Sequence, residues 1–128
     1  MVKSFKVLTT LTAYRVVAAV SGTANTVQYP ESAAKLALGV TIDDVKETTG
    51  SIAVKGPGEI AELYFNDTCT SGQEVAFDTS GRGIALSLDN TTTASSTPTG
   101  VIGVLVGETV SATGTIADVY LLPHLLNN

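Results

Sequence analysis

SIAVKGPGEIAELYF, residues 51–65, is the stretch that decides the fold class of this chain. It contains two short β-prone runs, Ser51–Lys55 and Glu59–Phe65, and the break between them is Gly56-Pro57-Gly58. Valine, isoleucine, tyrosine and phenylalanine are enriched in strands, whereas glycine and proline are typical of turns. The stretch therefore predicts two β-strands joined by a turn.

The same pattern of short β-prone runs between turn residues continues along the rest of the chain. The further expected strands are Arg15–Val20, Thr26–Tyr29, Ala37–Ile42, Glu74–Asp78, Ile84–Leu88, Val101–Val106 and Thr115–Leu122. Glu31–Leu36 could take one helical turn, and no other segment has a sustained period of 3.6 residues. The chain of 128 residues is long enough for one domain with its own core. We predict a single all-β domain, a sandwich or a small barrel.

An internal regularity links two parts of the chain, because Ala37–Ala53 aligns with Val101–Ala117 without a gap. Gly39 then falls on Gly103, and each lies within an apolar strand that is followed by a polar connection and a second strand. We predict two related hairpin-like units packed in one barrel, with the two glycines at a bulge or a close backbone approach. The alternative is a chance match of small residues in a chain rich in glycine and threonine.

The first twelve residues differ from the rest, since they contain no turn signal. Lys3–Leu8 can be a first strand or an extended arm, and twelve extended residues reach about 40 Å at ~3.3 Å each. Residues 1–20 carry three basic side chains and no acidic one. We predict an N-terminal arm over residues 1–12 and a barrel domain over residues 13–128, with a frayed terminus as the alternative.

The composition narrows the classes of partner. Charged residues make up 15% of the chain, against roughly 25% in an ordinary soluble domain. A surface poor in charge is cheap to desolvate and suits a permanent neighbour, although its hydroxyl groups can equally stay in water. The net charge of −5, with no basic cluster that includes aromatic residues, argues against nucleic acid as the main ligand.

Catalytic and metal-binding constellations are missing from the sequence. Cys69 is the only cysteine and His124 the only histidine, so we expect no disulfide, no metal site and no catalytic triad. Asp78-Thr79-Ser80-Gly81 resembles the Asp-Thr-Gly loop of aspartic proteases, but a second copy is missing and a polar turn is the better interpretation. Asp43-Asp44 is interpreted as solvated turn charge. We expect no enzyme, no cofactor and no small-molecule substrate.

Membrane insertion is not expected, because no apolar run approaches the ~18 residues of a span. A secretion signal is not expected either, since Arg15 interrupts the only stretch that could serve as its apolar part.

Three segments carry a resemblance to a known family. They are Ala37–Asp44 with Gly50–Val54, Ser71–Asp78 with Gly81-Arg82, and Val101–Glu108 with Gly114–Val119. In this order, over roughly residues 13–122, they are similar to the capsid cement (head-decoration) proteins of tailed phages. The apolar end Leu121–Leu126 is longer than the family pattern.

The resemblance implies a small β-barrel or β-tulip-like module, commonly trimeric, on the outer surface of an icosahedral capsid. Such a protein is made in the cytoplasm of the host bacterium, and it stabilises contacts between subunits of the major capsid protein. The arm would then dock on the capsid or on a neighbouring subunit. The residues expected to make this contact are Lys3, Phe5, Lys6, Val7, Leu8 and Arg15.

A carbohydrate- or receptor-binding β-module of a fibre or adhesin is the alternative function. Sites of that kind usually present exposed aromatic rings for stacking. This chain has no tryptophan, and its four tyrosines are scattered through the predicted strands. The composition therefore favours the capsid protein over the carbohydrate-binding module.

Overall fold

The structure is a computed structural model that describes residues 2–45, 50–86 and 99–126. Within these ranges the chain forms strands and no helix, so the all-β prediction is confirmed. Glu31–Leu36 forms turns, with the Lys35 amide 3.4 Å from the Ser32 carbonyl. The strands are β1 (Val2–Val7), β2 (Val16–Ala19), β3 (Thr26–Gln28), β4 (Gly39–Thr41), β5 (Ser51–Lys55), β6 (Ile60–Tyr64), β7 (Glu74–Phe77), β8 (Gly83–Ala85), β9 (Thr99–Leu105) and β10 (Ile116–Leu126). Residues 87–88 of the predicted strand Ile84–Leu88 lie outside the described residues.

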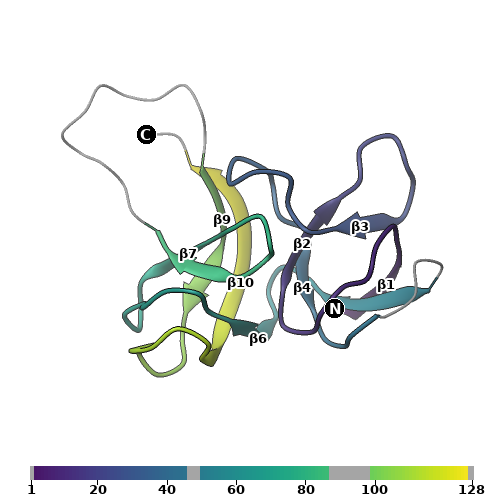
Figure 1. The fold of residues 1–128 in the computed structure, drawn as a ribbon. Helices are drawn as coiled ribbons and strands as arrows, with labels where there is room; N and C mark the ends of the chain where they lie inside the picture. Colours follow the sequence, from purple (N-terminus) through teal and green to yellow (C-terminus); the bar gives the residue numbers. More distant parts are fainter. Residues whose placement is uncertain (1, 46–49, 87–98, 127–128) are drawn as a thin grey trace.

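The strands from the first half of the chain form a closed barrel in the order β1-β3-β2-β4-β5, which confirms the predicted small barrel (Figure 1). β5 closes it by pairing antiparallel with β1, where Phe5 lies opposite Ile52. β1 and β3 run parallel, with Lys6 opposite Thr26. Closure leaves this sheet without an open edge.

The structure corrects the predicted boundary between an arm over residues 1–12 and a barrel over residues 13–128. Val2–Val7 form β1, which fills the place between β3 and β5 and pairs with both. Val7 is buried, and Phe5 packs against the barrel core. The segment gains strand hydrogen bonds and apolar burial in this place, which an arm in water would lack. The first strand, the alternative to an arm, is the observed state.

The strands from the second half form an open sheet in the order β6-β10-β9-β7-β8. β10 is the longest strand, and its register against β9 shifts between Leu121 and His124. Pro123 lies within that shift, at a point that β6 no longer reaches, since β6 pairs with β10 between Ile116 and Tyr120. Proline is tolerated at bulges and strand edges because it has no N–H to donate. This explains why β10 continues beyond Leu122, where the predicted strand ended.

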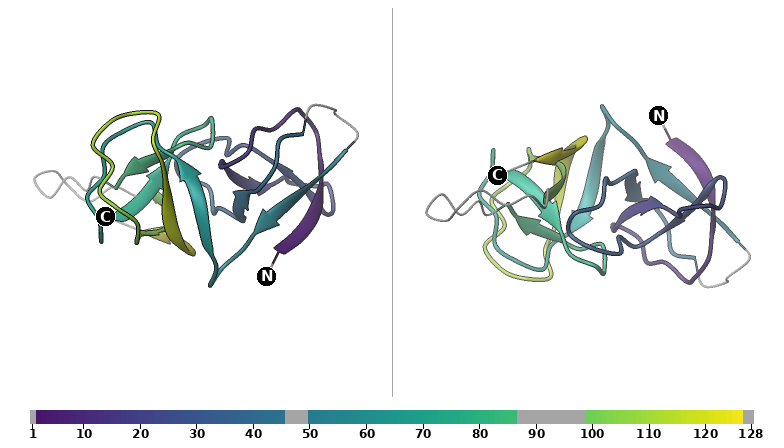
Figure 2. Two further views of the ribbon diagram at one scale, coloured as in Figure 1. Left: turned by 90° about the horizontal axis from the view of Figure 1, so that it is seen from below. Right: turned by 90° about the horizontal axis from the view of Figure 1, so that it is seen from above.

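The stretch at residues 51–65 forms its two strands as predicted, but they belong to different sheets. β5 buries Ile52 and Val54 inside the barrel, whereas β6 buries Ala61 and Leu63 against the second sheet. Figure 2 shows the result from below and above, with the purple and blue barrel strands on one side and the green and yellow strands on the other. The turn at Gly56–Gly58 therefore links the two halves of the molecule.

The internal regularity has a structural counterpart, although not in one barrel. β4 and β5 pair in the barrel, and β9 and β10 pair in the second sheet. The prediction of one shared barrel is wrong because β4 and β5 belong to the closed barrel, whereas β9 and β10 belong to the second sheet. The predicted close approach is confirmed, since a Cβ at Gly39 would lie 2.0 Å from the Lys55 carbonyl oxygen and one at Gly103 1.9 Å from that of Tyr120.

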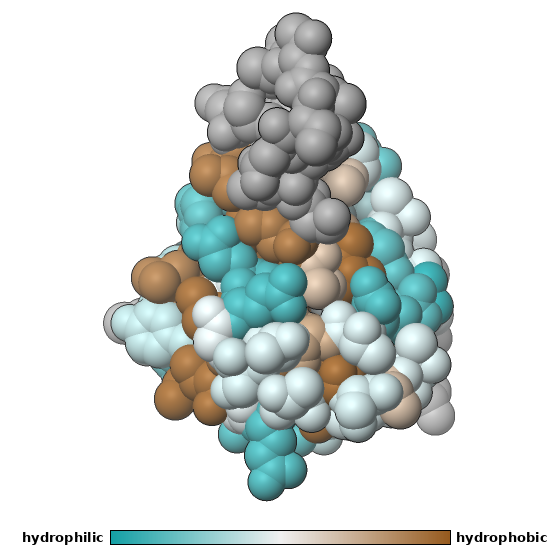
Figure 3. Space-filling model, turned by 90° about the vertical axis from the view of Figure 1, so that its left-hand side faces the viewer, coloured by the Kyte–Doolittle hydropathy of each residue, from teal (hydrophilic) through white to brown (hydrophobic). Residues whose placement is uncertain are grey.

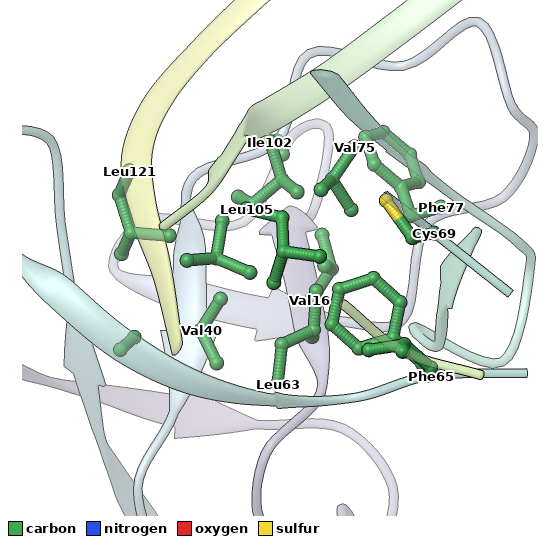
Figure 4. Close-up of a cluster of buried hydrophobic side chains, with 14 residues drawn as sticks. Val16, Val40, Leu63, Phe65, Cys69, Val75, Phe77, Ile102, Leu105 and Leu121 are labelled. Carbon is green, nitrogen blue, oxygen red and sulfur yellow. The ribbon is translucent and has the colours of Figure 1, made fainter. Parts of the chain in front are cut away.

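The core consists of two apolar clusters. The smaller one fills the barrel and includes Val7, Val27 and Ile52. The larger one lies under the second sheet, and the barrel residues Val16 and Val40 belong to it. Figure 4 shows these two valines among Leu63, Leu105 and other side chains of the second sheet. The barrel thus packs its outer side on the second sheet, and the two halves share one core.

Candidate interaction surfaces

The residues predicted to contact a capsid or a neighbouring subunit separate into three groups. Lys3, Lys6 and Leu8 are exposed on or just after β1. Phe5 and Val7 point into the barrel, so they support the strand and are not available to a partner. Arg15 is partly buried and lies elsewhere, between the two halves of the molecule.

Arg15 has a structural role at the junction of the barrel and the second sheet. Its guanidinium carbon lies 4.6 Å from the centre of the Tyr64 ring, a cation–π distance, and Nη1 donates to the Ser80 carbonyl at 3.3 Å. The neighbouring backbone adds two links, because the Tyr64 amide donates to the Tyr14 carbonyl and the Val16 amide to the Gly81 carbonyl. Arg15 therefore helps to join the two halves of the molecule, and its contact with a partner stays a prediction.

We predict that Arg15→Gln lowers the free energy of unfolding by about 1 to 2 kcal/mol, because the cation over Tyr64 is lost. Urea unfolding followed by circular dichroism measures the change. Lys6→Gln is the matched control, since it removes an exposed cation and should stay within about 0.5 kcal/mol of the original chain. Equal stabilities of the two variants would contradict a structural role for Arg15.

The first candidate surface is the β1 strip, which we define as the exposed residues Val2, Lys6 and Leu8. Lys3 lies on the other side of the strand, because it pairs with Val54, which points into the barrel. Val2 and Leu8 are 48% and 47% exposed, so the strip combines apolar side chains with the cation of Lys6. The flanking strands β3 and β5 carry no acidic residue. The strip is thus a basic and apolar surface without local charge compensation from its neighbouring strands.

The second candidate surface is the β6–β10 face, the outer side of the second sheet. We define it by Ile60, Glu62, Ile116, Asp118, Tyr120 and Leu122, all of which are exposed. Cross-strand pairing places Ile60 opposite Tyr120 and Glu62 opposite Asp118. The apolar members are 37% to 51% exposed and lie together on one face, so they form an exposed apolar patch. Figure 3 shows hydrophobic groups in brown among hydrophilic ones on the end of the molecule that the second sheet forms.

The β6–β10 face is acidic as well as apolar. A shallow hollow of about 250 Å³ on it is lined by Glu62, Glu108 and Asp118 together with neighbouring threonine and aliphatic residues. None of these three carboxylates forms an ion pair with another described residue. The face therefore has the opposite charge to the β1 strip.

Sequence reasoning missed the β6–β10 face. The available signal was the run Ile116–Leu122, in which both alternating sets contain apolar residues: Ala117, Val119 and Leu121 face the core, and Ile116, Tyr120 and Leu122 face outward. A strand with one side in water usually alternates apolar and polar residues. Apolar residues on both sides indicate that both sides are covered.

The remaining groups considered for chemistry have structural roles. Asp78 accepts hydrogen bonds from the amides of Ser80 and Arg82 and forms an ion pair with Arg82 at 2.8 Å, so it fixes a turn. Asp44 accepts from the Ala13 amide at 2.7 Å. Cys69 lies in the core of the second sheet, where burial, and secondly Asp67, raises the pKa of its thiol. A raised pKa keeps the thiol protonated and weakly nucleophilic.

His124 lies in β10, with Nδ1 2.6 Å from the Leu122 carbonyl oxygen. In the part of the chain that the structure describes, no group of three or more histidine, cysteine or acidic side chains is arranged to hold a metal ion. Within the same residues, no helix has the length and apolar character needed to cross a membrane.

Comparison with solved structures finds proteins of similar fold. No protein-family model matches the chain, and no curated protein matches it by sequence. The fold is similar to the crystal structure of the head fiber gp8.5 N base of bacteriophage phi29, with a TM-score of 0.68. The two chains are 14% identical, and the similarity covers 95% of this chain and 93% of the other. At that identity the likeness shows a shared fold.

Proposed function

We propose that this chain is a non-catalytic structural protein of a phage virion that binds the outer surface of an icosahedral capsid. In this role it stabilises contacts between subunits of the major capsid protein. It is made in the cytoplasm of the host bacterium and acts as a homo-oligomer, which we expect to be a trimer. Nucleic acid, membrane and small-molecule substrates are not among its partners.

The observation that carries this proposal is the fold similarity to the phi29 head fiber base, which extends over nearly the whole of both chains. A fold by itself does not imply a function, because one fold hosts many. Here the sequence points independently in the same direction, since three of its segments resemble phage head-decoration proteins. Agreement between a structural neighbour and a separate sequence pattern supports a phage virion protein.

The surface of the molecule is compatible with a capsid-bound role. It presents two strand-built surfaces with exposed apolar side chains, the β1 strip and the β6–β10 face. Exposed apolar patches of this kind mark protein interaction sites. Several linked copies that each bind one capsid edge would gain affinity through effective concentration, even if each contact is weak.

A fibre protein is the second candidate, because the structural neighbour is the base of a head fiber. In that role the chain would attach to the capsid without stabilising it, or would bind a receptor or carbohydrate. The tyrosines give little support to carbohydrate stacking: Tyr64 lies under Arg15, and the Tyr29 hydroxyl accepts from the Thr12 amide at 2.8 Å. Tyr120 is the exposed tyrosine, at 37%.

The test uses shells assembled from the major capsid protein of the same genome, mixed with the purified chain. We expect the chain to co-sediment with expanded shells in a sucrose gradient and to raise the temperature at which those shells dissociate. Serum albumin is the control for trapping in the pellet. Binding without a change in shell stability would favour the fibre base over the capsid-stabilising protein.

Two results would contradict the proposal as a whole. One is a chain that stays at the top of the gradient at all concentrations of shells. The other is saturable binding to a glycan on an array in the absence of any binding to shells. The first result removes the capsid as a partner, and the second replaces it with a carbohydrate.

A further inference from the structure

We propose that copies of this protein assemble head to tail, with the β1 strip of one copy docked on the β6–β10 face of the next. A second copy of the same chain thus covers the β6–β10 face. The inference rests on the oligomer included in the proposed function and names the surfaces that build it.

The β6–β10 face has the features of a surface that is covered in an assembly. Ile60 is 51% exposed and Leu122 47%, and Tyr120 lies between them on the central strand of the face. Removing the exposed part of these apolar side chains from water is favourable, so the isolated chain forgoes this gain. The apolar residues provide a reason for the face to bind, but they do not select the partner.

The carboxylates select the partner. Glu62 and Asp118 lie directly opposite each other in the register of β6 and β10, and like charges in that position repel. The cations beside β6 form no ion pair with Glu62 or Asp118. The Arg15 guanidinium lies over Tyr64, and Lys55 Nζ donates to the Ile60 carbonyl at 3.0 Å. A cation supplied by another molecule would compensate the pair.

The β1 strip supplies a cation of the required kind on the same chain. Lys6 has no ion-pair partner among the described residues. Val2 and Leu8 lie on the same segment and are apolar, so the strip can match both the charged and the apolar parts of the face. The strip and the face are complementary in both properties.

The two surfaces are different from each other and belong to different sheets, so the contact is heterologous. A contact of that type forms a ring when its rotation closes and a filament when it does not. Charged pairs at a rim contribute mainly to specificity and to the association rate, while buried apolar groups contribute most of the affinity. The lysine–carboxylate pairs therefore fix the orientation, and the apolar side chains hold the copies together.

Charge reversal tests the pairing. The first variant carries Glu62→Lys and Asp118→Lys, and the second carries Lys6→Glu. Each variant alone should associate at least about 100-fold more weakly than the original chain in sedimentation equilibrium, because like charges then meet across the contact. A single chain with all three substitutions should associate again, because the two surfaces then exchange their charges and remain complementary.

The control is a charge exchange outside both surfaces, Glu31→Lys with Lys35→Glu. These residues form an exposed ion pair at 3.9 Å within one segment, so the exchange keeps the net charge and should leave association unchanged. Urea unfolding of every variant separates lost association from lost folding. All the substituted side chains in the first and second variants are exposed, so we expect native stability in each.

Self-association is measured without capsids, so this inference and the proposed function can fail separately. An original chain that stays monomeric at all accessible concentrations overturns the head-to-tail contact, whether or not the chain binds shells. Full association of either reversed variant alone overturns it as well. A chain that self-associates as predicted but does not bind shells would support the head-to-tail contact and contradict the proposed capsid binding.

Discussion

Deletion of residues 2–7 is expected to unfold the barrel, not to release a folded domain from a dispensable arm. The deletion removes β1, so β3 and β5 lose their common neighbour and the closed sheet opens. The barrel core also loses Val7 and the packing of Phe5. Burial of two such side chains contributes about 3 to 6 kcal/mol, which is comparable to the 5 to 15 kcal/mol that stabilise a typical domain.

Far-UV circular dichroism and urea unfolding would measure this effect, and an apolar dye would report the opened core. Lys3→Gln combined with Lys6→Gln is the matched control, because it removes both charges and keeps the strand. The control should unfold like the original chain. A truncated chain with an unchanged unfolding transition would show that β1 is an accessory segment after all.

The second large effect is expected for Gly103→Ala, which should destabilise the chain by about 3 kcal/mol or more. A Cβ at this position would lie 1.9 Å from the Tyr120 carbonyl oxygen, an atom of the paired strand that cannot rotate away. β9 and β10 would have to separate, and both cover the larger core. Thermal unfolding with calorimetry measures the loss.

Gly22→Ala is the control for the conformational freedom of glycine. Its φ is +82° and a Cβ there meets no atom within 4 Å, so only the left-handed backbone disfavours alanine, by about 1 to 2 kcal/mol. Gly39→Ala should resemble Gly103→Ala, because its Cβ would lie 2.0 Å from the Lys55 carbonyl oxygen. If Gly103→Ala costs no more than Gly22→Ala, the close approach of the strands is not a determinant of stability.

The barrel and the second sheet are joined through a small set of residues, and both predicted losses of stability depend on this junction. Val16 and Val40 join the barrel to the core of the second sheet, and Arg15 lies over Tyr64 at the same junction. Damage to either sheet therefore reaches the other through this shared core. We expect one cooperative unfolding transition for the original chain, as for other single small domains.

The candidate surfaces show where sequence reasoning succeeded and where it could not. The basic character of the first segment was visible from the sequence, and Lys3 and Lys6 are indeed exposed. Phe5 and Val7 lie on the inner side of the strand together with Lys3, and Lys6 lies on the outer side, because side chains alternate along a strand. Once the segment is a strand, two of the six predicted contact residues, Phe5 and Val7, pack in the barrel core.

The sequence by itself determined the class of the fold and the place of nearly every strand. Short alternation of β-prone residues between turn residues is a local property, and it identified β5, β6 and the strands around them correctly. The close approach at Gly39 and Gly103 was also local, since only glycine lacks the Cβ that would prevent it. These features depend on a few neighbouring residues and can therefore be predicted from the amino-acid sequence alone.

Only the tertiary structure decided which strands share a sheet and which side of each strand meets water. Pairing of β1 with β5 joins residues far apart in sequence, and the sequence of neither segment predicts its partner strand. The same holds for the opposition of Glu62 and Asp118, which exists because β6 and β10 are neighbours. Long-range pairing is set by how all apolar faces can be buried at once, a property of the whole chain and not of any one segment.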